Sequence, residues 1–192
     1  MISQLFVVDW ALISISLFNA LLLIWLGLTV VLNAERRDWG VRLVTAGFLS
    51  GALFFVCHTV IIGHELTVFG SEDLEGWWRL GWFPVVLAPF AWYMVILWYV
   101  GFWEGQPARF RRLHRPVFWP LVSYTLLLTG LLIFAHPLPS YLKLTQLDFS
   151  GTTAIAGTPA LLLLYPPFGL LCMVLSLDAL RHPAPSQRMM GD

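Results

Sequence analysis

The segment FVCHTVIIGHE, residues 55–65, brings two histidines and a cysteine close together in an apolar run. Imidazole and thiolate groups are the usual protein ligands of zinc and haem iron. His58 and His64 lie six residues apart, so a regular helix would point them about 120° away from each other and separate them by about 9 Å. The two histidines therefore cannot bind one metal from the same helix, and the sequence predicts no metal site.

A haem b would require a second histidine on a neighbouring span at a matching depth. His136 is the one partner that the predicted spans could bring near His58. We disfavour this pair because His136 is followed by Pro137 at the expected end of a helix, where a ligand is held less firmly. The expected cofactor is therefore none, and a haem-binding membrane subunit is kept as a minor alternative.

The composition is that of a membrane protein. Of the 192 residues, 58% are hydrophobic and 11% are charged, so polar side chains could not cover a soluble globule of this size. The formal net charge is zero, which leaves no basic face for a nucleic acid. Cys57 and Cys172 lie far apart inside apolar runs, as expected of small buried side chains.

Five apolar runs are long enough to cross a membrane as helices. A helix rises about 1.5 Å per residue and the hydrocarbon core is about 30 Å thick, so each span needs roughly 20 residues. The sequence therefore predicts an all-α integral membrane protein with one membrane domain, residues 1–192, and a cytoplasmic tail or truncated linker at 183–192. The predicted spans are approximately 11–32, 41–63, 81–102, 116–135 and 159–180.

Basic residues are distributed unevenly between the two sides of these spans. Of the eleven Lys and Arg residues, Arg79 and Lys143 fall on one side. This asymmetry is a strong positive-inside signal. We expect an outside N-terminus and a cytoplasmic C-terminus, in the inner membrane of a bacterium. The basic residues on the predicted cytoplasmic side are Arg36, Arg37, Arg42, Arg109, Arg111, Arg112, Arg115, Arg181 and Arg188.

The predicted outer side carries more aromatic residues and prolines than are needed to set the orientation of the chain in the membrane. Pro84 and Pro89 fall inside the third span, where proline frees backbone carbonyls that neighbours or water must satisfy. We expect this span to bend and open a pocket for a small apolar ligand or a lipid tail. The alternative is an aromatic belt at the membrane interface around ligand-free helices. The candidate ligand-binding residues are His58, Trp78, Trp82, Tyr93 and His136.

Small and polar residues inside the spans predict helix packing. Gly47 and Gly51 form a GxxxG pattern that permits close approach of another helix, in the same bundle, in another membrane subunit or in a second copy. Asn19 and hydroxyl side chains such as Thr59 and Thr125 are expected to form hydrogen bonds between helices. The expected partners are therefore the lipid bilayer and neighbouring membrane helices.

The spans carry no recognisable catalytic constellation. Serine, threonine and histidine occur without a buried acidic partner at a familiar spacing. Asp178 lies one turn before Arg181 near the predicted cytoplasmic exit, and no second carboxylate in the spans accompanies it. We therefore expect a non-catalytic protein.

The order of several segments resembles a known family. The segments are SLFNALLLIWLGLTVVLNAERR, GALFFVCHTVIIG, WWRLGWFPVVLAPFAWYMVILWY and LSLDALRHPAPSQRMMGD. They resemble the amino-terminal seven-helix membrane region that precedes histidine kinase and related output domains in bacteria. The resemblance implies a sensory region with an outside N-terminus and a cytoplasmic exit. Five spans are present here and no kinase segment follows them, so the family's enzymatic output is not carried over.

Two function hypotheses follow from these observations. The first is a sensory or signal-transducing input region, in which a ligand, a lipid or the state of the membrane at the outer half shifts helix packing. The second is an accessory or structural subunit of a larger, energy-transducing membrane complex. The chain is expected to be either a portion of a longer protein or a complete five-span relative.

Overall fold

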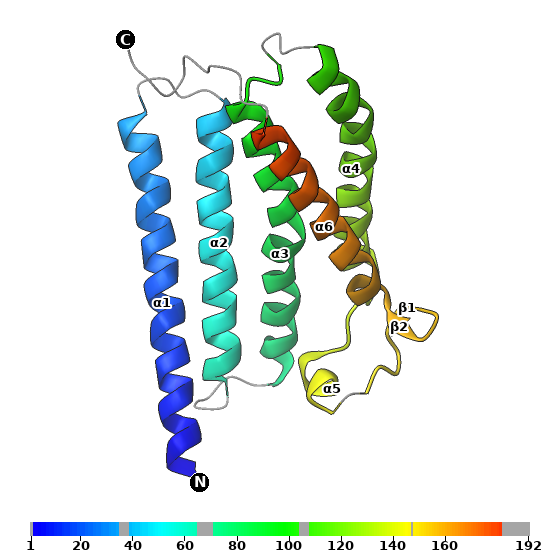
Figure 1. Ribbon diagram of the computed structural model, residues 1–192. Coiled ribbons are helices and arrows are strands. Elements are labelled where there is room, and N and C mark those ends of the chain that lie inside the picture. Colours follow the sequence, from blue (N-terminus) through cyan, green and yellow to red (C-terminus); the bar gives the residue numbers. More distant parts are fainter. Residues whose placement is uncertain (1, 35–38, 65–70, 104–107, 147, 182–192) are drawn as a thin grey trace.

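The computed structural model describes residues 2–34, 39–64, 71–103, 108–146 and 148–181. Most of these residues belong to five long helices, and a short helix and two short strands lie between the last two of them (Figure 1). The elements are α1 (Ile2–Asn33), α2 (Trp39–Gly63), α3 (Ser71–Tyr99), α4 (Ala108–Phe134), α5 (Tyr141–Thr145), β1 (Ala154–Ile155), β2 (Thr158–Pro159) and α6 (Ala160–Leu180).

All five long helices are apolar and long enough to cross a membrane. The prediction of an all-α, multi-pass membrane protein is therefore confirmed. The predicted tail at 183–192 lies outside the described residues. The membrane-spanning parts of the helices are Val7–Asn33, Trp39–Gly63, Leu74–Tyr99, Leu113–Phe134 and Ala160–Leu180.

α1, α3 and α4 begin eight to ten residues before their predicted spans. α1 starts at Ile2 instead of residue 11, and α3 starts at Ser71 instead of residue 81, with the mostly polar sequence SEDLE. α4 starts at Ala108, and Pro116, the predicted start of its span, lies inside the helix. Hydropathy thus finds the long apolar part of each helix and misses the polar first turns of α3 and α4.

The helices form a row that widens into a three-helix group at one side (Figure 1). α1, α2 and α3 stand side by side in that order. α4 and α6 pack against α3 and against each other, and α6 leans across the other two. Within the described residues, α1 packs against α2 and against no other helix. α3 is therefore the central helix, because it contacts α2, α4 and α6.

The buried core lies where α3, α4 and α6 meet. Tyr93 and Leu97 of α3, Leu121 and Leu128 of α4 and Phe168 of α6 are all fully buried there. Lipid tails are as apolar as these side chains, so close packing rather than escape from water stabilises such a core. The three helices around it therefore enclose the main cluster of buried apolar side chains.

α1 and α2 meet through small side chains. Ser16 of α1 is buried, and Asn19, one turn later, is half-buried. A Cβ added at Gly51 of α2 would lie 3.1 Å from Leu23 of α1, whereas at Gly47 it would have no neighbour within 4 Å. Of the two glycines in the predicted GxxxG pattern, Gly51 therefore packs against α1, and Gly47 has no close neighbour among the described residues.

Hydroxyl groups in the spans form two kinds of hydrogen bond. Thr59 and Thr125 each donate, at 2.8 Å, to the carbonyl four residues earlier in the same helix. The expectation of bonds between helices is wrong for these two residues, because that carbonyl lies within reach of their own hydroxyl. Tyr124 of α4 does bond across helices, donating to the Leu164 carbonyl of α6 at 2.9 Å.

α2 and α3 approach each other closely at two points. At the first point, the Trp98 indole of α3 lies against the backbone of Gly40, where an added Cβ would overlap the ring. At the second, an added Cβ on Gly81 would come 3.2 Å from the Cβ of Cys57. A glycine at each contact permits the close approach of the two helices.

The contact between Gly40 and Trp98 gives a stability prediction. Gly40→Ala should destabilise the protein by about 1–3 kcal/mol, because the indole must move to make room for the methyl group. Unfolding of the purified protein in a detergent titration would measure the change. Gly47→Ala is the matched control, since the same substitution on the same helix meets open space. Equal losses of stability in the two variants would contradict the contact.

Candidate functional site

A buried chain of polar side chains joins α3, α4 and α6. The Tyr93 hydroxyl lies 2.9 Å from Nδ1 of His114, and Nε2 of His114 lies 3.3 Å from Oδ2 of Asp178. Tyr93 and His114 are 0% exposed, and the Asp178 side chain is 35% exposed. One imidazole thus connects a hydroxyl on one helix with a carboxylate on another. We refer to these three residues as the His114 network.

The helix ends bring the network together at one end of the bundle. Tyr93 lies near the end of α3, His114 near the start of α4 and Asp178 in the last turn of α6. Because α3 and α4 are consecutive and antiparallel, the end of one meets the start of the other (Figure 1). α6 ends beside them. The network therefore lies at the end of the bundle that the sequence predicts to be cytoplasmic.

Imidazole suits the central position of this network. A neutral histidine donates from one ring nitrogen and accepts at the other. With its proton on Nε2, His114 directs that proton toward the Asp178 carboxylate, 3.3 Å away, and accepts from the Tyr93 hydroxyl at Nδ1. This tautomer is assigned from the network, and it gives Nδ1 a donor away from water.

The order of hydroxyl, imidazole and carboxylate also occurs in nucleophilic catalysis. Here Tyr93 and His114 are fully buried among the helices, so their reactive atoms are closed to a substrate in this structure. What the arrangement does is hold three helices in one register. A displacement of α3 or α6 would disturb its contact with His114, and a displacement of α4 would disturb both contacts.

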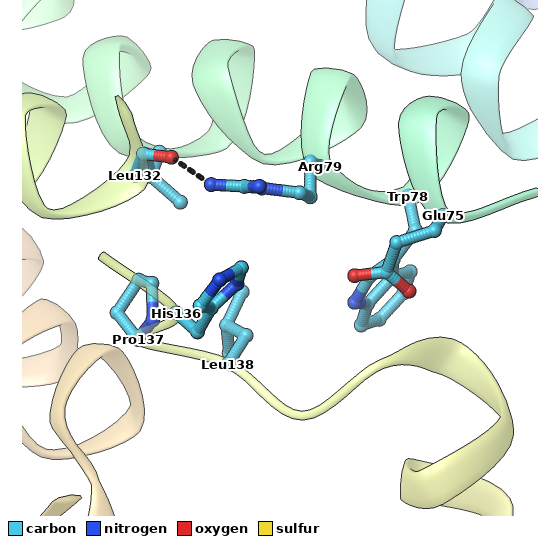
Figure 2. A pocket seen from close by; sticks show the side chains of 7 residues that line it. All are labelled: Glu75, Trp78, Arg79, Leu132, His136, Pro137 and Leu138. Carbon is cyan, nitrogen blue, oxygen red and sulfur yellow. Dashed lines mark hydrogen bonds between the residues drawn. The ribbon is translucent and has the colours of Figure 1, made fainter. Parts of the chain in front are cut away.

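A second set of polar contacts ties α3 to the loop between α4 and α6. Arg79 Nη2 donates to the carbonyl oxygen of Leu132 at 2.8 Å (Figure 2). It also donates to the carbonyl oxygen of Ala135 at 3.1 Å. Trp78 Nε1 donates to the Pro139 carbonyl at 3.1 Å. The last carbonyls of a helix lack partners within it and lie at its negative end, so a guanidinium is a favourable cap for α4. We refer to Trp78 and Arg79 with these bonds as the loop clamp.

A small cavity lies beside the loop clamp. Figure 2 shows His136 on the loop below Arg79, with Glu75 and Trp78 farther along α3. The cavity measures about 10 Å³, which is room for about one water. Sites for small molecules usually measure about 300 Å³ or more. Its lining residues are Glu75, Trp78, Arg79, Leu132, His136, Pro137 and Leu138.

A tight hairpin shapes the loop ahead of α6. β1 and β2 pair antiparallel, with Ile155 opposite Thr158. The two residues between them, Ala156 and Gly157, have positive φ angles of 50° and 79°. Such a two-residue turn matches the twist of the strands that it joins. The hairpin leads directly into Ala160, the first residue of α6.

Side-chain bonds hold the part of the loop before the hairpin. Lys143 Nζ donates to the Ser150 carbonyl at 2.8 Å. The Asp148 carboxylate accepts bonds from the Ser150 backbone N–H and hydroxyl, both at 2.9 Å. The backbone bond, followed by the hydroxyl bond, lowers the pKa of Asp148 below its ordinary value. These bonds are therefore present at neutral pH and are lost as the pH falls through that lowered pKa.

His58 faces a different neighbour. Its Nδ1 lies 2.9 Å from the Ser16 hydroxyl of α1, and its ring stacks on Phe54 with centroids 5.9 Å apart. His136 instead lies in the loop after α4, beside α3. The two imidazoles considered for a shared haem are thus directed at different interfaces.

The five candidate ligand-binding residues do not form one site. Trp78 and Trp82 contact each other edge to face, with ring centroids 5.7 Å apart, and Trp78 and His136 line the small cavity. Tyr93 belongs to the His114 network, and His58 faces α1. Ligand binding by these residues stays a prediction, and the structure distributes them over three separate places.

Sequence reasoning missed His114 and Arg79, whose side chains contact other helices in the structure. His114 was missed because hydropathy starts the fourth span at Pro116 and leaves the histidine in a basic loop. The available signal was Asp178, since a carboxylate inside an apolar span requires a polar partner. Arg79 was counted for its charge alone, although an isolated cation next to an interfacial tryptophan is also suited to cap a helix end.

The His114 network gives a second stability prediction. Tyr93→Phe should lower the free energy of unfolding by about 0.5–2 kcal/mol, because it leaves Nδ1 of His114 without its donor. Detergent-induced unfolding would measure the loss. Tyr99→Phe, near the end of the same helix, is the matched control, since no hydrogen bond of its hydroxyl is found among the described residues. A Tyr93→Phe variant as stable as this control would contradict the network.

Comparison with known proteins adds no relative. No protein-family model, no curated protein and no solved structure matches the chain. The resemblance to the seven-helix sensory regions of histidine kinases therefore stays a prediction. The function has to be argued from the residues and their geometry.

Proposed function

We propose that this protein is a non-catalytic sensory or signal-transducing membrane module. The observation that carries the proposal is that α3 and α4 are bonded to each other at both ends. The loop clamp joins them at one end and the His114 network at the other, where it also includes α6. A change at the loop therefore has a mechanical route to the last turn of α6, which is the coupling that an input module requires.

The route follows one helix. Arg79 and Tyr93 lie on α3, about 21 Å apart along its axis. Helices that switch between two packings commonly shift by about 1–2 Å as rigid bodies. A shift of that size exceeds what a 2.9 Å hydrogen bond can absorb, so the Tyr93–His114 bond either moves α4 with α3 or breaks. In both cases the contact of His114 with Asp178 changes.

The proposed orientation makes the loop the outer, input side. Arg42, Arg115 and Arg181 are all exposed, and they lie where α2 begins, α4 begins and α6 ends. Basic residues near the ends of spans favour the cytoplasmic side. The α4–α6 loop then faces the outside of a bacterial inner membrane, and the His114 network lies toward the cytoplasm.

Cysteine labelling tests this orientation. Ala154 in the hairpin and Arg181 after α6 are exposed, whereas the native Cys57 and Cys172 are buried. A membrane-impermeant maleimide added to intact cells should label Ala154→Cys and should leave Arg181→Cys unlabelled until the cells are opened. The reverse pattern would overturn the orientation.

An accessory or structural subunit is the second candidate, and α1 is the observation that favours it. α1 leaves most of its apolar surface uncovered by the chain: Phe18, Leu21 and Trp25 are each more than 60% exposed. Such a surface faces either lipid or another membrane protein. A structural subunit requires that surface but has no need of coupling between the two ends of the bundle.

Spin-label distances distinguish the two candidates. Labels at Arg42→Cys and Arg181→Cys report the separation of α2 and α6 at the proposed cytoplasmic end. Arg79→Met removes the two bonds to the end of α4. In a signalling module it should shift the mean label distance by about 1–2 Å or split the distribution. Adding Tyr93→Phe should reduce that response.

Lys143→Met is the matched control for this experiment. It removes a bond from Lys143 to Ser150 within the same loop but leaves α3 untouched, so the label distance should not change. Equal distance distributions in the parent protein and in Arg79→Met would overturn the signalling proposal and favour the structural subunit.

A further inference from the structure

An open apolar groove of about 730 Å³ runs between α2 and α3. Its walls extend from Leu43 to Phe54 on α2 and from Pro84 to Val95 on α3, and Tyr165 of α6 also lines it. The volume lies within the range of about 300–1,000 Å³ that is typical of ligand sites. None of the five residues predicted to bind a ligand is part of its lining.

The groove lies between the two close contacts of α2 with α3. The contact of Gly40 with Trp98 is beyond one end of it, and the contact of Cys57 with Gly81 is beyond the other. Pro84 lies in α3 between these contacts. Proline removes a backbone hydrogen bond and bends a helix, which accounts for a gap between two helices that touch on either side of it. The groove is therefore bounded at both ends by contacts between α2 and α3.

The length of the groove matches one leaflet of a bilayer. Leu43 to Phe54 on α2 and Pro84 to Val95 on α3 each span about 16 Å along the helix axis. Half of the hydrocarbon core is about 15 Å thick. The length of the groove therefore fits an acyl chain of one leaflet.

The end of the groove near Gly40 lies where lipid headgroups are expected. Arg42 directly precedes Leu43, the first groove residue of α2, and it is exposed. The rings of Trp39 and Trp103 meet edge to face at the same end, with centroids 4.8 Å apart. Tryptophan marks the interfacial depth, and a basic residue there attracts anionic headgroups.

We propose that this groove binds an anionic phospholipid, with an acyl chain between α2 and α3 and the phosphate close to Arg42. The length of the groove, its apolar walls and the positive charge of Arg42 at the headgroup end all fit this one occupant. The site is separate from the loop clamp and the His114 network. The lipid-binding proposal goes beyond the proposed signalling role and does not depend on it.

Native mass spectrometry of the purified detergent-solubilised protein tests the proposal. Phosphatidylglycerol should remain bound at lower added lipid than phosphatidylcholine with the same acyl chains. Arg42→Gln should weaken phosphatidylglycerol binding by about fivefold, the effect of one basic residue at a membrane surface. Arg181→Gln removes a charge at the same end of the bundle, where α6 ends and no neighbouring residue in the sequence lines the groove, and should have no comparable effect.

A substitution that fills the groove tests the position of the acyl chain. Gly47→Leu places a side chain in open space on the groove wall, so it should fold normally and displace bound lipid. Gly130→Leu on α4 is the matched control, because an added Cβ there also meets open space and lies outside the groove. Lipid binding should be lost in the first variant and kept in the second.

Three results would overturn the proposal. Equal binding of the two lipids, or equal loss with Arg42→Gln and Arg181→Gln, would exclude the headgroup contact. Lipid binding by Gly47→Leu at the level of the parent protein would exclude the groove as the site. A dimer that dissociates with Gly47→Leu would show that a second copy of the chain occupies the groove instead.

Discussion

Hydrocarbon offers no hydrogen-bond partner, and this constraint determines how the bundle is held together. A polar side chain in a span needs either its own backbone or a neighbouring helix. The Thr59 hydroxyl bonds to a carbonyl of its own helix. His114 instead contacts Tyr93 and Asp178 on two neighbouring helices. Apolar faces do not choose among neighbours, because lipid competes equally for them. Polar contacts join α1 to α2 and join α4 to α3 and α6, and close glycine contacts join α2 to α3.

These contacts are concentrated on one side of the molecule. α3, α4 and α6 share the core around Tyr93 and Phe168, and they are joined by the His114 network, by Tyr124 and by the loop clamp. α2 packs on the other side of α3 through glycine contacts that leave a groove between them. The protein thus combines a three-helix frame joined by polar contacts with an α2–α3 pair that has a groove between its two glycine contacts. The proposed coupling belongs to the first part and the proposed lipid site to the second.

The five spans were predictable from sequence, because length and hydropathy are local properties of a chain. The helix starts were not, since the polar first turns of α3 and α4 carry no hydropathy signal. The candidate site was predicted least well. Histidines and tryptophans on one predicted side were grouped by depth, yet depth does not determine the direction of a side chain. His58 faces α1. Tyr93 forms a hydrogen bond with His114, which lies in a segment that the sequence analysis assigned to a loop.

The position of α1 at the end of the row has a consequence for how the protein comes apart. Within the described residues, α1 rests against α2 alone, and Ser16 of α1 is buried. Its departure would break one helix interface and leave the three-helix frame intact. Local opening with the lowest free energy precedes global unfolding. α1 is thus the helix whose backbone amides should exchange with solvent first under mild detergent, well before those of α3.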